Sequence, residues 1–94
     1  MKITFGPDKN LKNIQERGLS FEEAVKFDFS TADFEIDARR DYGSETRHIA
    51  VGYLGHRLHV LCFIETIDGI RIISFRKANA REARRHGKPK TIDG

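Results

Sequence analysis

Residues 47–77 contain three strand-forming stretches divided by two tight turns, and this pattern restricts the fold more than any other feature of the sequence. Gly55-His56 separates Arg47–Leu54 from Arg57–Glu65, and Asp68-Gly69 leads into a third stretch at 70–77. Glycine at the first position of a two-residue turn supplies the positive φ of a type II′ hairpin. Strands joined by such short turns run antiparallel. The sequence therefore predicts a three-stranded antiparallel meander.

Alternation along these strands predicts which side chains share a face, because every second residue of a strand points to the same side of the sheet. We expect Arg47 to lie with Ile49, Val51 and Tyr53; Leu58 with Val60, Cys62 and Ile64; and Ile70 with Ile72, Ser74 and Arg76. Cys62 then lies on an apolar face, where we expect a small buried side chain rather than a nucleophile.

Two helices are expected before the meander. After a short strand at 1–5, Pro7 suits a first helical position, and Gly18 suits the left-handed residue that ends the helix after about Arg17. Ser20 begins a capping box in which its hydroxyl accepts from the amide of Glu23, and this second helix runs to 27 or 28. Its expected buried stripe is Phe21, Ala24, Val25 and Phe27.

The remaining segments complete an α+β fold. We expect an edge strand at 34–37, a polar loop at 39–44, and a last helix capped by Asn79 with Glu82 and stopped by Gly87. Residues 88–94 read as a loose tail. Helices followed by a meander predict a mainly antiparallel sheet. A length of 94 residues predicts one domain, 1–94.

Composition places the chain among soluble proteins of a reducing compartment. A single cysteine excludes an intramolecular disulfide, and no stretch approaches the roughly 18 apolar residues of a membrane helix. Residues 1–7 lack the apolar core of a signal peptide. We expect a cytoplasmic protein that does not engage membranes.

The charge is uneven along the chain. Residues 1–70 carry nine Lys and Arg against twelve Asp and Glu, whereas 71–90 carry eight against Glu82 alone. Such asymmetry predicts a basic surface that meets a polyanion or an acidic protein. The alternative is a solvated C-terminal helix that keeps the protein soluble.

Charged residues on strands are the candidates for chemistry. The sequence has no glycine-rich phosphate loop and no metal-ligand spacing, so we expect neither a cofactor nor a metal. His48 and His59 can face each other across a hairpin, but two imidazoles leave a metal mostly uncoordinated. Arginine on an apolar strand face is fixed by its scaffold and suits phosphate binding, but a cross-strand ion pair is an equally good reading.

Several segments together resemble the BrnT family of bacterial toxins. They are Lys9 with Asn13 and Gly18; 20–24; Glu45-Thr46-Arg47 leading to Gly52; Arg57-Leu58; and 71–78 with Arg81-Glu82. The resemblance implies a RelE-like fold, with two N-terminal helices packed on the sheet and a C-terminal helix. It implies a ribonuclease toxin of a type II toxin–antitoxin pair that cleaves RNA, blocks translation and arrests growth.

Partners also follow from the resemblance. It implies a DNA-binding antitoxin of the BrnA kind, a heterotetramer built on an antitoxin dimer, and contact with operator DNA only through that antitoxin. The sequence departs from the family pattern at Phe5-Gly6, where a Trp-Asp pair is usual, at Glu16-Arg17-Gly18, where Lys-His-Gly is usual, and at Phe63, where a Tyr is common.

A metal-free ribonuclease needs a base for the ribose 2′-hydroxyl, cations for the charge on phosphorus and an acid for the leaving oxygen. We assign phosphate stabilisation to Arg47 and Arg76, phosphate positioning to Ser74, and the base or an arginine-orienting role to Glu45 or Glu65. His48 and Lys77 are weaker candidates for helpers. Lys9, Lys77, Arg81, Arg84 and Arg85 are the expected RNA contacts. The alternative is a binding module without catalysis that uses 71–90.

Overall fold

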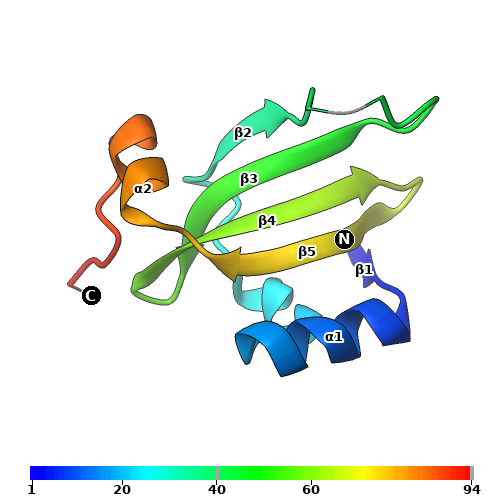
Figure 1. The fold of residues 1–94 in the computed structure, drawn as a ribbon, viewed down its shortest axis with the longest axis horizontal. Coiled ribbons are helices and arrows are strands. Elements are labelled where there is room, and N and C mark those ends of the chain that lie inside the picture. The colour runs from blue at the N-terminus through cyan, green and yellow to red at the C-terminus, as the bar shows by residue number, and fades with distance from the viewer. Residues whose placement is uncertain (40, 94) are drawn as a thin grey trace.

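The α+β class is confirmed by a computed structural model that describes residues 1–39 and 41–93 (Figure 1). The elements in chain order are β1 (Lys2–Thr4), α1 (Pro7–Arg17), the 3₁₀ helix η1 (Phe21–Lys26), β2 (Asp33–Ile36), β3 (Arg47–Leu54), β4 (Arg57–Glu65), β5 (Gly69–Lys77) and α2 (Ala80–His86). Over these ranges, no helix is long and apolar enough to cross a membrane.

One five-stranded sheet, in the order β1-β5-β4-β3-β2, organises the fold. The expected meander is confirmed, since β3, β4 and β5 are successive antiparallel neighbours. Gly55 in the first turn has φ 61°, as that turn requires. The expected edge strand is β2, and β1 forms the other edge by pairing in parallel with β5.

A β-bulge in β5 changes the expected faces. Cys62 pairs with Ser74 but Phe63 pairs with Ile72, so Ile73 is an extra residue on β5. A bulge reverses the alternation beyond it. The prediction that Ile70, Ile72, Ser74 and Arg76 share one face is therefore wrong: Ile70 and Ile72 join Phe75 in the core, and Ser74 and Arg76 face the opposite side.

The main core lies between the sheet and the two N-terminal helices. Its buried members are Phe21, Ala24, Phe27, Ala50, Leu61, Phe63, Ile70, Ile72 and Phe75. Asn13 of α1 is buried and donates to the carbonyls of Leu19 (2.8 Å) and Phe75 (2.9 Å), which ties the helix to β5. This packing leaves the other face of the sheet free of α1 and η1.

The second helix differs from its prediction. It is a 3₁₀ helix, and the Ser20 hydroxyl accepts from the amide of Glu22 at 3.2 Å, not from that of Glu23. A 3₁₀ helix repeats every three residues, so Phe21, Ala24 and Phe27 share its buried face. Val25, expected in the stripe, is therefore 72% exposed.

The C-terminal helix α2 has the expected capping box between Asn79 and Glu82, and Gly87 ends it with φ 61°. Ala83 is buried against a second small cluster of Val51, Leu58, Val60 and Ala78. The segment after it, expected to be loose, is hydrogen-bonded to the β3–β4 hairpin over its described part, 88–93. The Lys90 carbonyl accepts from the Leu58 amide, and the Ile92 amide donates to the His56 carbonyl, both at 2.8 Å.

Candidate functional site

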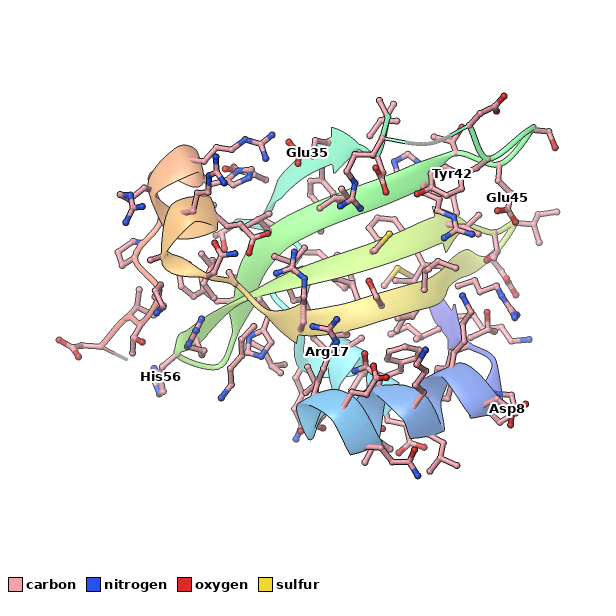
Figure 2. The ribbon with its side chains drawn as sticks, in the orientation of Figure 1. Asp8, Arg17, Glu35, Tyr42, Glu45 and His56 are labelled. Carbon is pink, nitrogen blue, oxygen red and sulfur yellow. The ribbon has the colours of Figure 1, made fainter. Side chains whose placement is uncertain are left out.

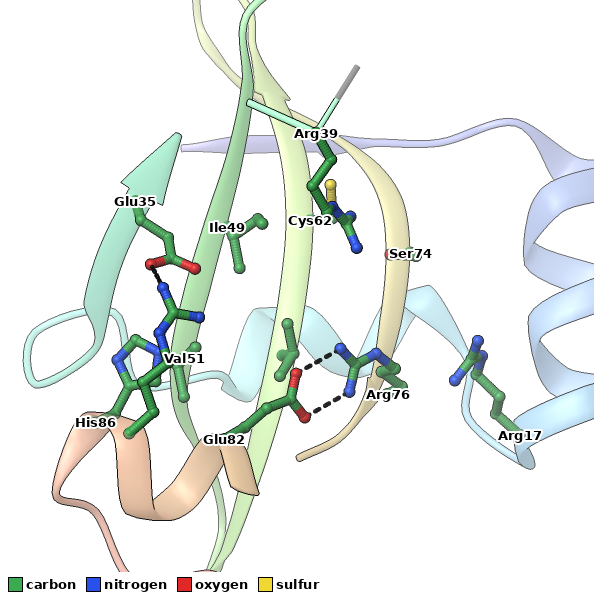
Figure 3. A pocket seen from close by; sticks show the side chains of 12 residues that line it. Arg17, Glu35, Arg39, Ile49, Val51, Cys62, Ser74, Arg76, Glu82 and His86 are labelled. Atoms are coloured by element: carbon green, nitrogen blue, oxygen red, sulfur yellow. Dashed lines mark hydrogen bonds and ion pairs between the residues drawn. The ribbon is translucent and has the colours of Figure 1, made fainter. Parts of the chain in front are cut away.

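A polar groove lies on the sheet face opposite α1 and η1, with α2 closing one end (Figure 3). Its volume is about 330 Å³. The lining side chains come from every part of the chain: Arg17, Glu35, Arg39, Ile49, Val51, Val60, Cys62, Ser74, Arg76, Glu82, Arg85 and His86. Four arginines therefore meet over the small and apolar side chains of the central strands.

Arg76 is held rigidly in this groove by Glu82 of α2. The guanidinium donates through Nη1 and Nη2 to the two carboxylate oxygens at 2.8 and 2.7 Å. These hydrogen bonds from Arg76 lower the pKa of Glu82 to about 2. Glu82 Oε1 also accepts from the Asn79 amide at 2.9 Å, so one carboxylate caps α2 and orients Arg76.

A second pocket of about 410 Å³ extends the groove and shares Arg39, Cys62 and Ser74 with it. Here Asp37, whose side chain is 1% exposed, accepts from Arg39 Nε at 2.8 Å and Nη2 at 2.9 Å. The Tyr42 hydroxyl donates to the same carboxylate at 3.0 Å. The hydrogen bonds from Arg39 hold the pKa of Asp37 well below its usual range.

Arg47 is the third fixed guanidinium. Its Cζ lies 4.2 Å from the centre of the Tyr42 ring, and Nη2 lies 3.6 Å from Glu45 Oε2. Within the described ranges, Arg47 Nε is buried and has no hydrogen-bond partner. A buried donor without an acceptor costs about 1–3 kcal/mol.

Cys62 is 8% exposed, as expected, but it faces the groove and not the main core. Burial raises the pKa of its thiol. A raised pKa disfavours the thiolate, which is the nucleophilic form. Cys62 therefore serves as part of the floor of the groove.

The structure brings together several of the residues that the sequence singled out. Ser74 and Arg76 line the groove, Arg47 lines the second pocket beside Ser74, and Arg85 reaches the groove from α2 to bind Glu35 at 2.6 Å. Lys9 lines a third pocket, of about 260 Å³, between α1 and β5, which also contains Ser74 and Arg17. Ser74 is therefore common to all three pockets.

Other candidates lie apart from the groove. Glu65 is on the opposite face, with Oε1 3.3 Å from His48 Nε2. His48 pairs with Phe63 and His59 pairs with Gly52, so the two histidines do not face each other. The remaining candidates line none of the three pockets; they are Glu45, Lys77, Arg81 and Arg84, all exposed.

Sequence reasoning missed Arg17, Glu35, Asp37, Arg39 and Tyr42. Figure 2 shows Tyr42 and Glu45 together at one end of the sheet and Arg17 at the end of α1. One sequence pattern could have predicted part of this set: the acidic Asp37 and the basic Arg39 lie two residues apart, directly after an edge strand. In residues 1–39 and 41–93, no group of three or more His, Cys, Asp or Glu is arranged to hold a metal.

A family model matches residues 5–82 of the chain, and it describes a ribonuclease toxin, BrnT, of a type II toxin–antitoxin system. The chain belongs to this family. The resemblance to BrnT toxins is thereby confirmed, and as a BrnT toxin the protein is a ribonuclease with a cognate antitoxin as partner. No curated protein matches the chain.

Proposed function

We propose that this BrnT toxin cleaves RNA in the groove by stabilising charge on phosphorus with fixed arginines. The observation that supports this most is the convergence of Arg39, Arg47 and Arg76 around Ser74, together with the unpartnered buried Nε of Arg47. A planar guanidinium matches the oxygens of a phosphate and keeps its charge at any physiological pH. Guanidiniums already held by carboxylates need little reorganisation when that charge develops.

The proposed step is transfer of phosphorus within the RNA. The ribose 2′-oxygen attacks the adjacent phosphorus, the bond to the 5′-oxygen breaks, and the products are a 2′,3′-cyclic phosphate and a 5′-hydroxyl. A base takes the proton from the 2′-hydroxyl, and the leaving oxygen receives a proton. In this scheme Arg47 and Arg76 bind the non-bridging oxygens, and Ser74 donates to one of them. The step uses no metal ion.

The carboxylates divide between two tasks. Glu82 and Asp37 have depressed pKa values, which makes them weak bases, so they position Arg76 and Arg39. Of the two carboxylates considered as the base, Glu45 lies beside Arg47 and Glu65 lies on the other face of the sheet. Glu45 lines none of the three pockets, but it contacts Arg47, which lines the second pocket, and we therefore assign the base or the orienting role to Glu45.

The RNA strand extends beyond the scissile phosphate in this proposal. Lys9 and Arg85 contact its backbone at the edges of the groove, and the exposed Lys77, Arg81 and Arg84 add longer-range attraction. Cleavage of messenger RNA blocks translation and arrests growth. The toxin acts in the cytoplasm, and a DNA-binding antitoxin neutralises it in a heterotetramer that contacts operator DNA.

The test is cleavage of a defined RNA oligonucleotide by purified protein in EDTA, with and without ribosomes. Arg76→Ala and Arg47→Ala should each lower the rate by roughly 100-fold or more, the cost of removing one transition-state donor. Lys26→Ala, in an exposed pair with Glu23 at 3.6 Å, is the control and should cleave at the wild-type rate. Circular dichroism checks that each variant is folded.

The proposal fails if folded Arg76→Ala and Arg47→Ala cleave as fast as the wild type, or if EDTA stops cleavage. The non-catalytic alternative predicts intact RNA at large protein excess, with binding that weakens steeply in salt. Part of the basic segment on which that alternative depends is already paired inside the protein, since Arg76, Arg85 and Lys88 contact Glu82, Glu35 and Asp33.

A further inference from the structure

The outer edge of β2 carries backbone groups that no strand covers. β2 is the last strand of the sheet and pairs only with β3 among the described residues. The Asp37 amide donates to the Arg47 carbonyl at 2.8 Å, so residues 33, 35 and 37 direct their backbone groups to β3. In an antiparallel pair the alternate residues point the other way. The N–H and C=O of Phe34 and Ile36 therefore face outward.

The side chains of the same two residues are apolar and exposed. Phe34 is 54% exposed and Ile36 is 64% exposed. Both lie on the helix side of the sheet, where the Phe34 ring packs edge-on against Phe63 with centroids 6.5 Å apart. In Figure 1, α1 lies by β5, at the edge of the sheet opposite to β2, in agreement with its contacts to β5.

Of the described residues of β2, the two on this face, Phe34 and Ile36, are neither charged nor proline. Soluble proteins usually guard an edge strand with lysine, proline, a bulge or a charge. The opposite edge follows this rule, because β1 begins with exposed Lys2. The acidic residues of β2 point to the groove side, where Glu35 binds Arg85 and Asp33 binds His86.

We propose that an extended segment of the cognate antitoxin binds this edge as a sixth strand. Its backbone pairs with Phe34 and Ile36, and apolar residues at alternate positions of the segment cover their side chains. Strand addition of this kind obtains affinity from main-chain hydrogen bonds and specificity from alternate side chains. The proposal depends on membership of the BrnT family, which supplies the antitoxin, and not on the proposed cleavage step.

The size of the patch favours a wrapping segment over a second copy of this chain. Phe34 and Ile36 together expose roughly 200 Å² of apolar surface, since each is a little over half exposed. A stable interface buries about 800 Å² on each partner. A symmetric pairing of two four-residue strands falls well short of that, whereas an antitoxin segment can continue past β2 onto neighbouring surfaces.

The first experiment measures binding of the antitoxin encoded beside this gene, by isothermal titration calorimetry. A double variant, F34K with I36K, should raise Kd by 100-fold or more, because it buries two charges against apolar residues. The control is Val25→Lys, which changes an apolar side chain on η1 that is 72% exposed and should change Kd by less than threefold. Unchanged binding of the double variant, or equal weakening by Val25→Lys, would overturn the proposal.

The second experiment uses the wild-type chain and so does not depend on how the variants fold. The amides of Phe34 and Ile36 should exchange hydrogen rapidly in the free toxin and slowly in the complex. Rapid exchange of both amides in a saturated complex would overturn the proposal. It would also be overturned if the free toxin is a dimer and the double variant F34K with I36K is a monomer. RNA cleavage by the free double variant should match that of the wild type. A failure of the cleavage proposal would therefore appear in the Arg47 and Arg76 variants and would leave antitoxin binding unchanged.

Discussion

The Arg76–Glu82 pair allows a stability prediction that depends on pH. The substitution Glu82→Gln removes the charge but leaves an oxygen that can still accept from the Asn79 amide. The pKa of Glu82 falls from 4.5 to about 2 in the folded protein. At 1.36 kcal/mol per pKa unit, this corresponds to at most about 3 kcal/mol of stability. Since the two side chains are 31% and 22% exposed, solvent screening reduces the expected loss to about 1–2 kcal/mol at pH 7.

The sign of the pH dependence follows from the lowered pKa. A carboxyl group with a folded pKa below its unfolded value stabilises the protein above pH 4.5, and that stabilisation is lost as pH falls toward 2. The difference in unfolding free energy between wild type and Glu82→Gln should therefore be constant from pH 7 to pH 5. By pH 3 it should shrink to less than half.

Urea unfolding followed by circular dichroism at pH 7, 5 and 3 measures this difference. Glu16→Gln is the matched control, because Glu16 lies 3.9 Å from Lys12 on an exposed helix face, and it should cost less than about 0.5 kcal/mol. A difference for Glu82→Gln that stays the same at pH 3 and pH 7 would refute the assignment of the stabilisation to the ionised pair.

Four further outcomes are expected. Gly69→Ala should cost at least about 2 kcal/mol in urea unfolding, because a Cβ there would overlap the backbone of Lys2 and separate β1 from β5. Phe75→Ala should cost about 3–5 kcal/mol by the same measurement, since the ring is fully buried. Burial lowers the pKa of His59, so stability should fall as pH drops below about 6.5, and His59→Gln should flatten that part of the profile. Arg47→Lys should lower RNA cleavage more than tenfold despite keeping the charge, because an ammonium cannot bind two phosphate oxygens in one plane; wild-type cleavage would contradict the role given to Arg47.

Local chemistry made much of the fold predictable. Gly18 and Gly87 end their helices in the left-handed conformation, with φ 65° and 61°, because a residue without a Cβ adopts it at no steric cost. The capping box of Asn79 and Glu82 needs only residues three apart on one helical turn. The β3–β4 hairpin follows from Gly55 in its turn, whereas Gly69, expected in the second turn, is the first residue of β5. All these features depend on neighbours in sequence.

The features that were missed depend on distant neighbours. The run Ile70-Arg71-Ile72-Ile73 gives no sign that Ile73 is an inserted residue, because an apolar side chain suits either side of the bulge. The bulge nevertheless decides that Ser74 faces the groove. The sequence also did not reveal that η1 is a 3₁₀ helix. A segment of six residues makes few hydrogen bonds in either an α-helix or a 3₁₀ helix.

The candidate site was predicted only in part, because some of its residues lie on one strand and others come from distant segments. Arg76 and Ser74 are fixed by one strand, so spacing two apart places them on one surface. Arg39 and Tyr42 reach the site from a loop, and both donate hydrogen bonds to the buried carboxylate of Asp37, which the sequence does not reveal. Arg17 belongs to a helix that packs on the other face, and its long side chain reaches the groove past β5.

The parallel pairing of β1 with β5 has a consequence for the synthesis of a toxin. Lys2 lies beside Gly69, and the groove contains side chains from Arg17 to His86. At about 5–20 residues per second, a ribosome needs about 5–20 s to make a chain of this length. During synthesis β1 has no partner strand until Gly69–Arg71 of β5 have been made, and Arg76 has no carboxylate to hold it until Glu82 of α2 follows. In the mechanism proposed above, cleavage therefore requires α2, which is made after all five strands and completes the groove.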